Sequence, residues 1–546
     1  MRRYKSVLLL LALAISVLSA AANHQTEQSK ATREDAYRAN NIGVALLEQF
    51  KHKEAADSFK RALQLEPGLA LARVNLGIAL FNLPDLPAAQ KELQAASVAV
   101  PSAPQPHYLL GLLAKTQNRG DDAIASFQKV LRIDPNDVGA NVNLGQLYAQ
   151  QRKYPEAIAV LRTAVAAEPY NATALYNLGT ALMRAGQRVE GQKVIAQFQE
   201  LRQRGTGTTL GTNYLEQGRY AEAMASTGAE PELVDKRTPQ VVFVTVTPDM
   251  LRSADWPAEQ NSGAVLLFDY DSDGDLDLLE IGGTKQRLAR NDNGRFTDVT
   301  AQSGALAKAS SGTATAAIAG DYDNDSRPDL FVLRSGTSTL YRNDGNGSFS
   351  DVTTAAKIPA SPANAGSTAF ADVDHDGDLD ILIAGDGYLL LRNNGDRTFS
   401  DQTAAAKLAG KVSARSIVPT DFDNRRDVDL VVAGTENLSL WRNMRDGTFH
   451  DVATDVGLNV KGATSVAAGD VNKDGFTDFY FSRGDTGYFA LSDAKERFHI
   501  TTAPGDSVAS QFIDYDNDGL LDLVLVVPGG LRVVRNTGDA WIRALD

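Results

Sequence analysis

The chain has 546 residues, a formal net charge of −14 and no cysteine. So acidic a chain is a poor candidate for binding nucleic acid or an anionic membrane surface. The length predicts two to four domains, and the lack of cysteine excludes disulfides and lipid attachment at a cysteine.

Residues 1–22 are predicted to be a secretory signal peptide. Arg2, Arg3 and Lys5 precede an apolar run over residues 7–18, and three alanines follow at 20–22, as signal cleavage requires. This run is shorter than the roughly 20 residues of a membrane-spanning helix. We therefore expect export to the periplasm or the cell exterior, with no membrane span once the signal is removed. A retained membrane anchor is the alternative.

Residues 31–228 are predicted to form a helical-repeat domain, because alanine- and leucine-rich segments recur with a fixed period. The positions that recur every 34 residues are Pro67, Pro101, Pro135 and Pro169, Gly43, Gly77, Gly111, Gly145 and Gly179, and Ala55, Ala89, Ala123 and Ala157. This pattern resembles the tetratricopeptide repeat, which implies an all-α solenoid of paired helices. A further fragment, LGTNYLEQGRYAEAM from Leu210, resembles a capping hairpin.

The resemblance also implies a concave groove that binds a protein or peptide partner. Family geometry places on it three side chains from the first helix of each unit. In the first three units these are Asn40, Val44, Leu47, Val74, Ile78, Phe81, Tyr108, Leu112 and Lys115. The groove is largely apolar, so we expect a partner with an apolar segment. The alternative is that several of these side chains pack inside the solenoid.

Residues 229–240 contain two prolines and mixed charge without apolar periodicity, which predicts a linker. In the remaining residues, 241–546, an aspartate-rich pattern of nine residues recurs, typified by DVDHDGDLD. Its six copies are spaced by 44 to 52 residues and begin at Asp269, Asp321, Asp372, Asp421, Asp470 and Asp514.

These loops are predicted to bind calcium. A hard dication takes six to eight oxygen ligands, and a tight loop can turn places one, three, five and nine inward while place seven offers its backbone carbonyl. Glycine at place six permits the positive φ of the turn. The predicted ligand positions are Asp269, Asp271, Asp273, Asp275, Asp277, Asp321, Asp323, Asp325, Arg327, Asp329, Asp372, Asp374, Asp376, Asp378, Asp380, Asp470, Asn472, Asp474, Phe476, Asp478, Asp514, Asp516, Asp518, Leu520 and Asp522.

The fourth loop, which begins at Asp421, is predicted to be empty or weakest. It has Arg425 at place five and Arg426 at place six. The guanidinium of Arg425 is expected to stand in for calcium by reaching an aspartate at place one, three or nine. The second loop has Ser326 instead of glycine and is expected to be intermediate.

The residues around each loop predict strands. An EF-hand opens with the same spacing but needs glutamate at place twelve and an exiting helix, and glutamate occurs there only in the first copy, as Glu280. Apolar runs such as ILIAGDG follow the loops instead, as in buried strands. With a small-residue strand before each loop and motifs such as LYRNDGNGSF and FSDVT after it, each unit predicts a four-stranded propeller blade.

These motifs resemble the FG-GAP or VCBS-like repeats of integrin α-subunits and exported bacterial proteins, most of all the cartilage-acidic-protein or UnbV type. The resemblance covers residues 238–546 and implies an all-β propeller whose aspartate loops bind calcium. Six blades are favoured, and seven are the alternative. Phe243–Thr247 resembles an FxDVT strand moved to the front, which could complete the last blade.

The sequence contains no enzyme signature: its six histidines form no motif, and no nucleophile elbow, phosphate loop or zinc pattern occurs. We expect a secreted, non-enzymatic protein-interaction scaffold that combines a tetratricopeptide groove with a calcium-binding propeller. The alternatives are a calcium-dependent carbohydrate-active propeller enzyme, a glycan-binding module and a structural envelope component. A protein or peptide partner is expected at the groove, and a protein or glycan at the propeller.

Overall fold

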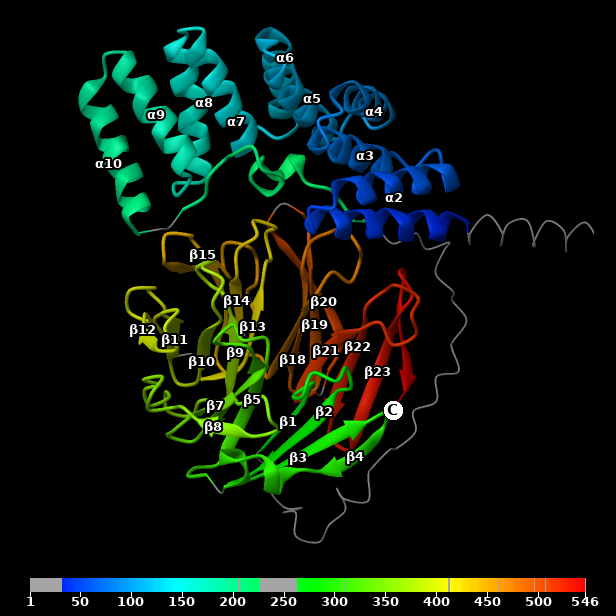
Figure 1. Ribbon diagram of the computed structural model, residues 1–546, viewed down its shortest axis with the longest axis vertical. Helices are drawn as coiled ribbons and strands as arrows, with labels where there is room; N and C mark the ends of the chain where they lie inside the picture. The colour runs from blue at the N-terminus through cyan, green and yellow to red at the C-terminus, as the bar shows by residue number, and fades with distance from the viewer. Residues whose placement is uncertain are drawn as a thin grey trace, which may run out of the picture. The chain divides into compact units, whose positions relative to one another are not determined.

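The chain folds into two compact units, residues 1–235 and 236–546, drawn as a ribbon in Figure 1. The computed structural model describes residues 32–204, 207–225, 263–308, 310–410, 413–460, 462–494, 496–505 and 507–545. The predicted signal peptide and the predicted linker lie outside these residues. Within them, no helix combines the length and the apolar character that crossing a bilayer requires.

The described part of the first unit is built from five successive helix pairs. Its first helix spans residues 32–48. The others are α2 His52–Leu65, α3 Ala70–Asn82, α4 Leu86–Ala99, α5 Pro104–Thr116, α6 Gly120–Ile133, α7 Val138–Gln150, α8 Tyr154–Ala167, α9 Ala172–Arg184 and α10 Arg188–Arg204. The all-α solenoid predicted from the 34-residue period is confirmed.

The recurring glycines lie where the two helices of a pair touch. A Cβ atom on Gly77 would stand 2.5 Å from Leu93 Cδ2, and a Cβ atom on Gly111 would stand 2.8 Å from Phe127 Cε1. Both partner side chains are completely buried. The same close approach joins Gly43 to Phe59, Gly145 to Leu161 and Gly179 to Ile195. The period therefore reflects a repeated helix contact that leaves no room for a side chain.

The segment after the last pair does not form the capping hairpin predicted from its sequence. Residues 207–225, here called the return segment, make two short 3₁₀ turns, η1 Tyr214–Glu216 and η2 Arg219–Ala221. Between them Gly218 has a φ of 103°, which a regular helix does not allow. Tyr214 and Tyr220 are buried in the same apolar cluster as side chains of the first four helix pairs.

The described part of the second unit consists of six four-stranded antiparallel sheets, each made of consecutive strands in sequence order. The first three sheets contain β1 Gly263–Phe268, β2 Asp277–Gly282, β3 Lys285–Asp292 and β4 Arg295–Asp298; β5 Ala314–Gly320, β6 Asp329–Arg334, β7 Thr339–Asn343 and β8 Phe349–Asp351; and β9 Ser367–Ala371, β10 Asp380–Ala384, β11 Tyr388–Asn393 and β12 Phe399–Asp401. The last three contain β13 Ala414–Thr420, β14 Asp429–Gly434, β15 Leu438–Asn443 and β16 Phe449–Asp451; β17 Ser465–Gly469, β18 Asp478–Arg483, β19 Thr486–Ser492 and β20 Phe498–Pro504; and β21 Ala509–Ile513, β22 Asp522–Val527, β23 Gly530–Asn536 and β24 Trp541–Leu545.

The six sheets are the blades of a six-bladed β-propeller, so the favoured blade number is confirmed. The first strands of successive blades contact one another from β1 to β21, which places them innermost. Apolar side chains of adjacent blades share a core, as Leu279 and Ile281 of β2 do with Leu330 and Val332 of β6. Phe243–Thr247 lies outside the described residues, and β24 is the outer strand of the last blade.

Candidate metal centres and groove

In all six aspartate loops the carboxylate at place one holds the turn. Asp269 Oδ1 accepts the backbone N–H of Asp273 at 3.1 Å, and Oδ2 accepts that of Gly274 at 3.0 Å. Place six has positive φ in every copy, including Ser326 at 67° and Arg426 at 63°. The conformation that favours glycine is therefore kept where glycine is absent. The same pair of hydrogen bonds is made by Asp321, Asp372, Asp421, Asp470 and Asp514.

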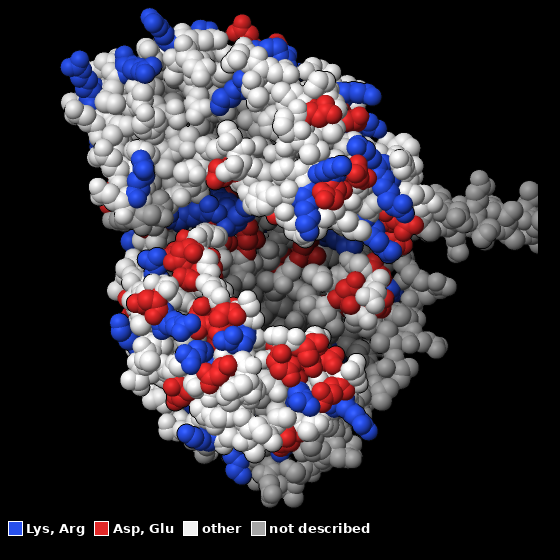
Figure 2. All heavy atoms as spheres, viewed as in Figure 1, with Lys and Arg blue, Asp and Glu red and all other residues white. Residues whose placement is uncertain are grey.

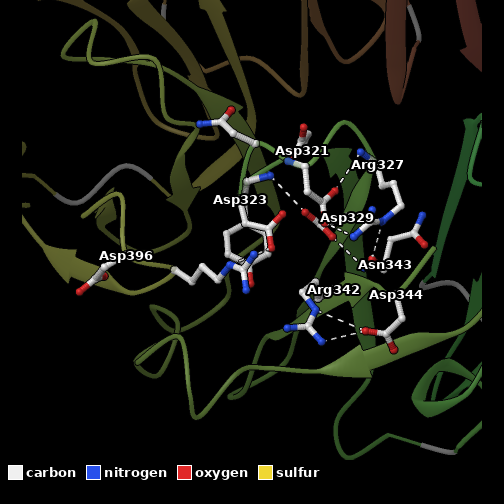
Figure 3. A network of polar contacts seen from close by, with 12 residues as sticks. Asp321, Asp323, Arg327, Asp329, Arg342, Asn343, Asp344 and Asp396 are labelled. Carbon is white, nitrogen blue, oxygen red and sulfur yellow. Dashed lines mark hydrogen bonds and ion pairs between the residues drawn. The ribbon is translucent and has the colours of Figure 1, made fainter.

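The aspartate at place nine is buried and joins the loop to the following hairpin. Asp329 Oδ1 accepts the N–H of Asn343 at 2.7 Å, and Oδ2 accepts that of Tyr322 at 3.2 Å (Figure 3). Asn343 Nδ2 in turn donates to Tyr270 O of the preceding blade at 2.8 Å. Burial raises the pKa of Asp329 to about 7, although the two amide donors oppose the shift. The equivalent aspartates with these two amide donors are Asp277, Asp380, Asp429, Asp478 and Asp522.

Carboxylate oxygens of five loops lie close enough together to share one cation. Within each group, one oxygen per residue lies within 4.8 Å of the others. Because calcium–oxygen distances are 2.3–2.6 Å, two ligands on opposite sides of an ion are about 5 Å apart. The spacing therefore fits calcium. The groups are Asp269, Asp271 and Asp273; Asp321, Asp323 and Asp325; Asp372, Asp374 and Asp380; Asp421, Asp423 and Asp429; and Asp514, Asp516 and Asp522.

The fifth loop departs from this arrangement because place three is an amide. Asn472 Oδ1 accepts the N–H of Asp474 at 2.9 Å, and Asn472 Nδ2 donates to Asp474 Oδ2 at 3.1 Å. This loop thus offers Asp470, Asp474 and Asp478 as carboxylates and Asn472 as an amide oxygen.

The carboxylate at place three accepts no hydrogen bond in the second and fourth loops. The Asp323 side chain is fully buried, neither oxygen accepts a hydrogen bond, and Arg397 Nε lies 3.2 Å from Oδ2. Burial raises the pKa of Asp323, and Asp325 adds to the shift while Arg397 opposes it. Both oxygens of Asp423 and Oδ1 of Asp374 are also buried without a hydrogen bond. Burying a charged group is costly unless it is paired. An arginine provides one such partner at each of these carboxylates, and a bound dication would provide another.

Place seven lies directly beside the carboxylates. In five loops its backbone N–H donates to the aspartate at place five, at 2.9 to 3.0 Å. Three of the four predicted carboxylate positions lie together in each of five loops: places one, three and five in the first two, and places one, three and nine in the third, fourth and sixth. The use of the place-seven carbonyl as a ligand stays a prediction. The residues at place seven are Asp275, Arg327, Asp378, Phe476 and Leu520.

Arginines of the hairpin motif approach the loop carboxylates, which the sequence analysis did not predict. Arg535, whose side chain is 1% exposed, lies 2.6 Å from Asp516 Oδ2 and 2.9 Å from Asp518 Oδ2. Arg392 Nε lies 2.6 Å from Asp374 Oδ2 in the third blade. On the face of the propeller shown in Figure 2, acidic and basic side chains also lie side by side.

In the first two blades the equivalent arginine pairs with the hairpin instead. Arg342 lies 2.9 Å from Asp344 Oδ1 (Figure 3), and Arg290 lies 2.9 Å from Asp292 Oδ2. The residue two places after the arginine explains the difference, because it is aspartate in these blades only. In the third, fourth and sixth blades it is Asn394, Met444 and Thr537. This RND pattern is the sequence signal that could have predicted where each arginine points.

The fourth loop contains internal cations. Arg425 Nε lies 3.2 Å from Asp423 Oδ2, and Arg442 Nε lies 3.0 Å from the same oxygen. Glu496 pairs with both guanidinium groups. Burial raises the pKa of Asp423 to about 6, and the two arginines oppose the shift. The expectation that Arg425 reaches a loop aspartate is confirmed, and the low calcium affinity of this loop stays a prediction.

The chain itself covers the groove predicted on the solenoid. Asn40, Leu47, Val74, Ile78 and Tyr108 are buried. These positions are therefore not open in this structure, and Leu47, Val74, Ile78 and Tyr108 share one apolar cluster with Tyr214 and Tyr220 of the return segment. Their role as partner-binding residues stays a prediction. The remaining predicted residues are partly buried, and they are Val44, Phe81, Leu112 and Lys115.

Comparison with protein families finds both repeat types. The FG-GAP-like repeat matches residues 269–332, 321–383 and 421–481. The tetratricopeptide repeat matches residues 40–104, 74–138 and 142–190 in one form and residues 114–165 in another. A comparison with curated proteins gives no match.

Several solved structures are similar to parts of the chain. MamA of Desulfovibrio magneticus RS-1 is 21% identical, with 31% of this chain and 96% of that chain covered and a TM-score of 0.29. YrrB, a tetratricopeptide protein with an unusual peptide-binding site, is 20% identical, with 33% and 92% covered and a TM-score of 0.28. An Agrocybe aegerita lectin that recognises non-reducing terminal N-acetylglucosamine is 18% identical, with 52% and 80% covered and a TM-score of 0.37. No conclusion about the function of this chain follows from these likenesses.

Proposed function

Because the chain contains tetratricopeptide repeats and FG-GAP-like propeller repeats, we propose that it is an exported, non-enzymatic protein-interaction scaffold whose propeller binds calcium. The observation that carries calcium binding is the fully buried Asp323 carboxylate, which accepts no hydrogen bond within a group of three aspartates. Export rests on the signal-like sequence of residues 1–22. The scaffold role rests on the pairing of two repeat domains.

The loop aspartates have different roles according to their place in the loop. Those at places one and nine accept backbone N–H groups, so they preform the loop and attach it to the blade. The aspartate at place three has no such contact in the second and fourth loops. A bound calcium ion would supply the positive charge that these crowded carboxylates need. This division of roles supports structural binding rather than acid–base catalysis.

Metal counting on the purified full-length chain tests the calcium proposal. After chelation and dialysis into calcium, we expect about five ions per chain, because the fourth loop has Arg425 where the other loops have an oxygen ligand at place five, and this arginine already pairs with Asp423. Asp323→Asn should lower the count by one. Asp485→Asn, at an exposed residue outside the loops, is the matched control. A count of zero for the unchanged protein would remove calcium from the proposal.

Glycan binding at the propeller is a second candidate, favoured by a pocket of about 480 Å³. Its lining combines hydroxyl, amide and guanidinium groups suited to sugar hydroxyls, from Gly263, Thr315, Ser335, Gly336, Asn364, Ala365, Gly366 and Arg415. A glycan screen should then show binding that Arg415→Ala abolishes. Binding that is unchanged by this substitution would place the glycan elsewhere.

A further inference from the structure

The return segment, shown in green in Figure 1, runs back along the solenoid. It contacts the first helix of several pairs in reverse chain order. It starts beside α9, where the backbone N–H of Leu210 donates to Thr173 Oγ1 at 2.9 Å. It then passes α5 and ends at α3 and the helix over residues 32–48. An end cap would cover the last helix pair alone. This segment instead contacts the first helix of the fifth, third, second and first pairs.

Two asparagines hold the backbone of Met224. Asn75 Nδ2 donates to Met224 O at 2.7 Å, and Asn75 Oδ1 accepts the N–H of Met224 at 3.0 Å. Asn40 Nδ2 donates to the same carbonyl at 3.3 Å. Both asparagine side chains are completely buried. Because Asn75 pairs with both backbone groups of one residue, this contact recognises a peptide backbone rather than a particular side chain.

Tyr108 recognises the middle of the segment. Its buried hydroxyl donates to Gln217 O at 2.6 Å. A Cβ atom on Gly218 would stand 2.4 Å from that hydroxyl, and Gly218 has the positive φ that side chains disfavour. The groove therefore requires glycine at this position of its ligand.

Two tyrosines anchor the segment in the solenoid. Tyr220 OH donates to Asp134 Oδ2 at 2.8 Å, and its ring centroid lies 6.2 Å from that of Tyr108. Tyr214 is 2% exposed, and its ring centroid lies 6.5 Å from that of His52. Buried aromatic anchors combined with backbone hydrogen bonds are typical of peptide ligands in grooves.

The return segment has little structure of its own. Its regular part is two 3₁₀ turns of three residues each, with a few internal hydrogen bonds such as Gly211 N to Glu216 O at 2.9 Å. Its release breaks the hydrogen bonds to Asn75, Tyr108 and Asp134 and exposes two tyrosines, while the helix pairs keep their own contacts. Local opening of this kind costs less than global unfolding. Such a segment can leave the groove without unfolding the helix pairs.

We propose that the return segment is an intramolecular ligand of the solenoid groove, and that an outside partner displaces it. The partner is an extended peptide with the same chemistry. Counted from a first tyrosine, it has a glycine four residues later and a second tyrosine six residues later. Ten residues after the first tyrosine, its backbone N–H and C=O are available to pair with Asn75. This inference rests on the proposed scaffold function and specifies its partner.

The test uses the full chain and a labelled synthetic peptide of residues 208–225. Gly218→Val places a side chain against Tyr108 and should expel the return segment while leaving every groove residue unchanged. Since the apparent dissociation constant falls as the open fraction rises, this variant should bind the peptide at least about tenfold more tightly than the unchanged chain. Gly186→Val is the control, because Gly186 also has positive φ but faces open space.

A peptide that carries the same glycine-to-valine change should not bind. If Gly218→Val retains its helical circular dichroism and binds no peptide, or if it loses its helices, the return segment is an integral part of the fold and the proposal is overturned.

Hydrogen exchange of the unchanged chain provides a second measurement. The amide of Met224, which donates to Asn75 Oδ1 of α3, should exchange through local opening, well before the amides of α5. Equal protection of the two regions would overturn the proposal. Because neither test needs calcium, a failure here with calcium still bound leaves the proposed scaffold in place and removes only this partner.

Discussion

Arg535 and Arg290 occupy the same position in their blades yet face different carboxylates. Arg535 is buried between Asp516 and Asp518, whereas Arg290 is 40% exposed and pairs with Asp292 in the hairpin. In the absence of metal, the buried arginine supplies the positive charge of the sixth loop. An ion that enters this loop must therefore compete with a resident guanidinium.

Arg535→Gln should destabilise the chelated propeller by about 3 kcal/mol, because removing one partner of a buried pair leaves the other charges unpaired. Calcium should then recover part of the loss, so the calcium-induced rise in melting temperature should exceed that of the unchanged chain. Arg290→Gln, at the equivalent exposed position, should change neither the stability of the chelated propeller nor the calcium-induced rise in melting temperature by much. Thermal melts with calcium and with chelator measure both variants, and equal behaviour would contradict the internal-cation role.

Part of this site could be predicted from sequence and part could not. The alternation of aspartates fixes which carboxylates converge, since places one, three and nine follow from the turn, and Asp372, Asp374 and Asp380 do converge. The arginines were missed because their long side chains can point either way from the hairpin. Only the neighbouring residue, as in Arg342 followed by Asp344, decides between the two orientations.

At the scale of helices, the contact between Gly77 of α3 and Leu93 of α4 sets the distance within a pair. Gly77→Ala should cost about 1–2 kcal/mol, because overpacking exceeds the gain in helix propensity. Adding Leu93→Ala should cost less than the sum of the two single changes, since it removes the clash. Gly120→Ala, whose Cβ would meet nothing within 4 Å, is the control. Chemical denaturation followed by far-UV circular dichroism gives these free energies, and additive effects would refute the contact.

The helix pairs and blades were predictable because each repeat encodes the same local contacts. The return segment was not, because its contacts are remote in sequence: Met224 lies 149 residues from Asn75. The segment from Leu210 matches a repeat helix locally, but Gly218 interrupts any helix there. The sequence of this segment resembles a helical hairpin, so a hairpin was predicted. In the structure the segment is irregular, and side chains far away in the sequence stabilise it.

At the scale of the whole molecule, the two compact units should unfold in separate transitions. All the predicted calcium ligands lie beyond residue 268, and all three tryptophans, Trp256, Trp441 and Trp541, belong to the second unit. Tryptophan fluorescence should therefore follow the propeller, while the helical circular dichroism signal follows the solenoid. One experiment can then assign each transition to its unit.

Chelation should lower the melting temperature of the transition followed by fluorescence and leave that of the helical transition unchanged. With millimolar calcium and a dissociation constant near 0.1 mM, each occupied loop contributes about 1.4 kcal/mol to propeller stability. Magnesium at the same concentration should restore less propeller stability than calcium does, because it dehydrates reluctantly and demands an octahedral site. If the helical transition moved together with the fluorescence transition, the units would not be independent, and if neither moved, the buried aspartates would be balanced by the arginines alone.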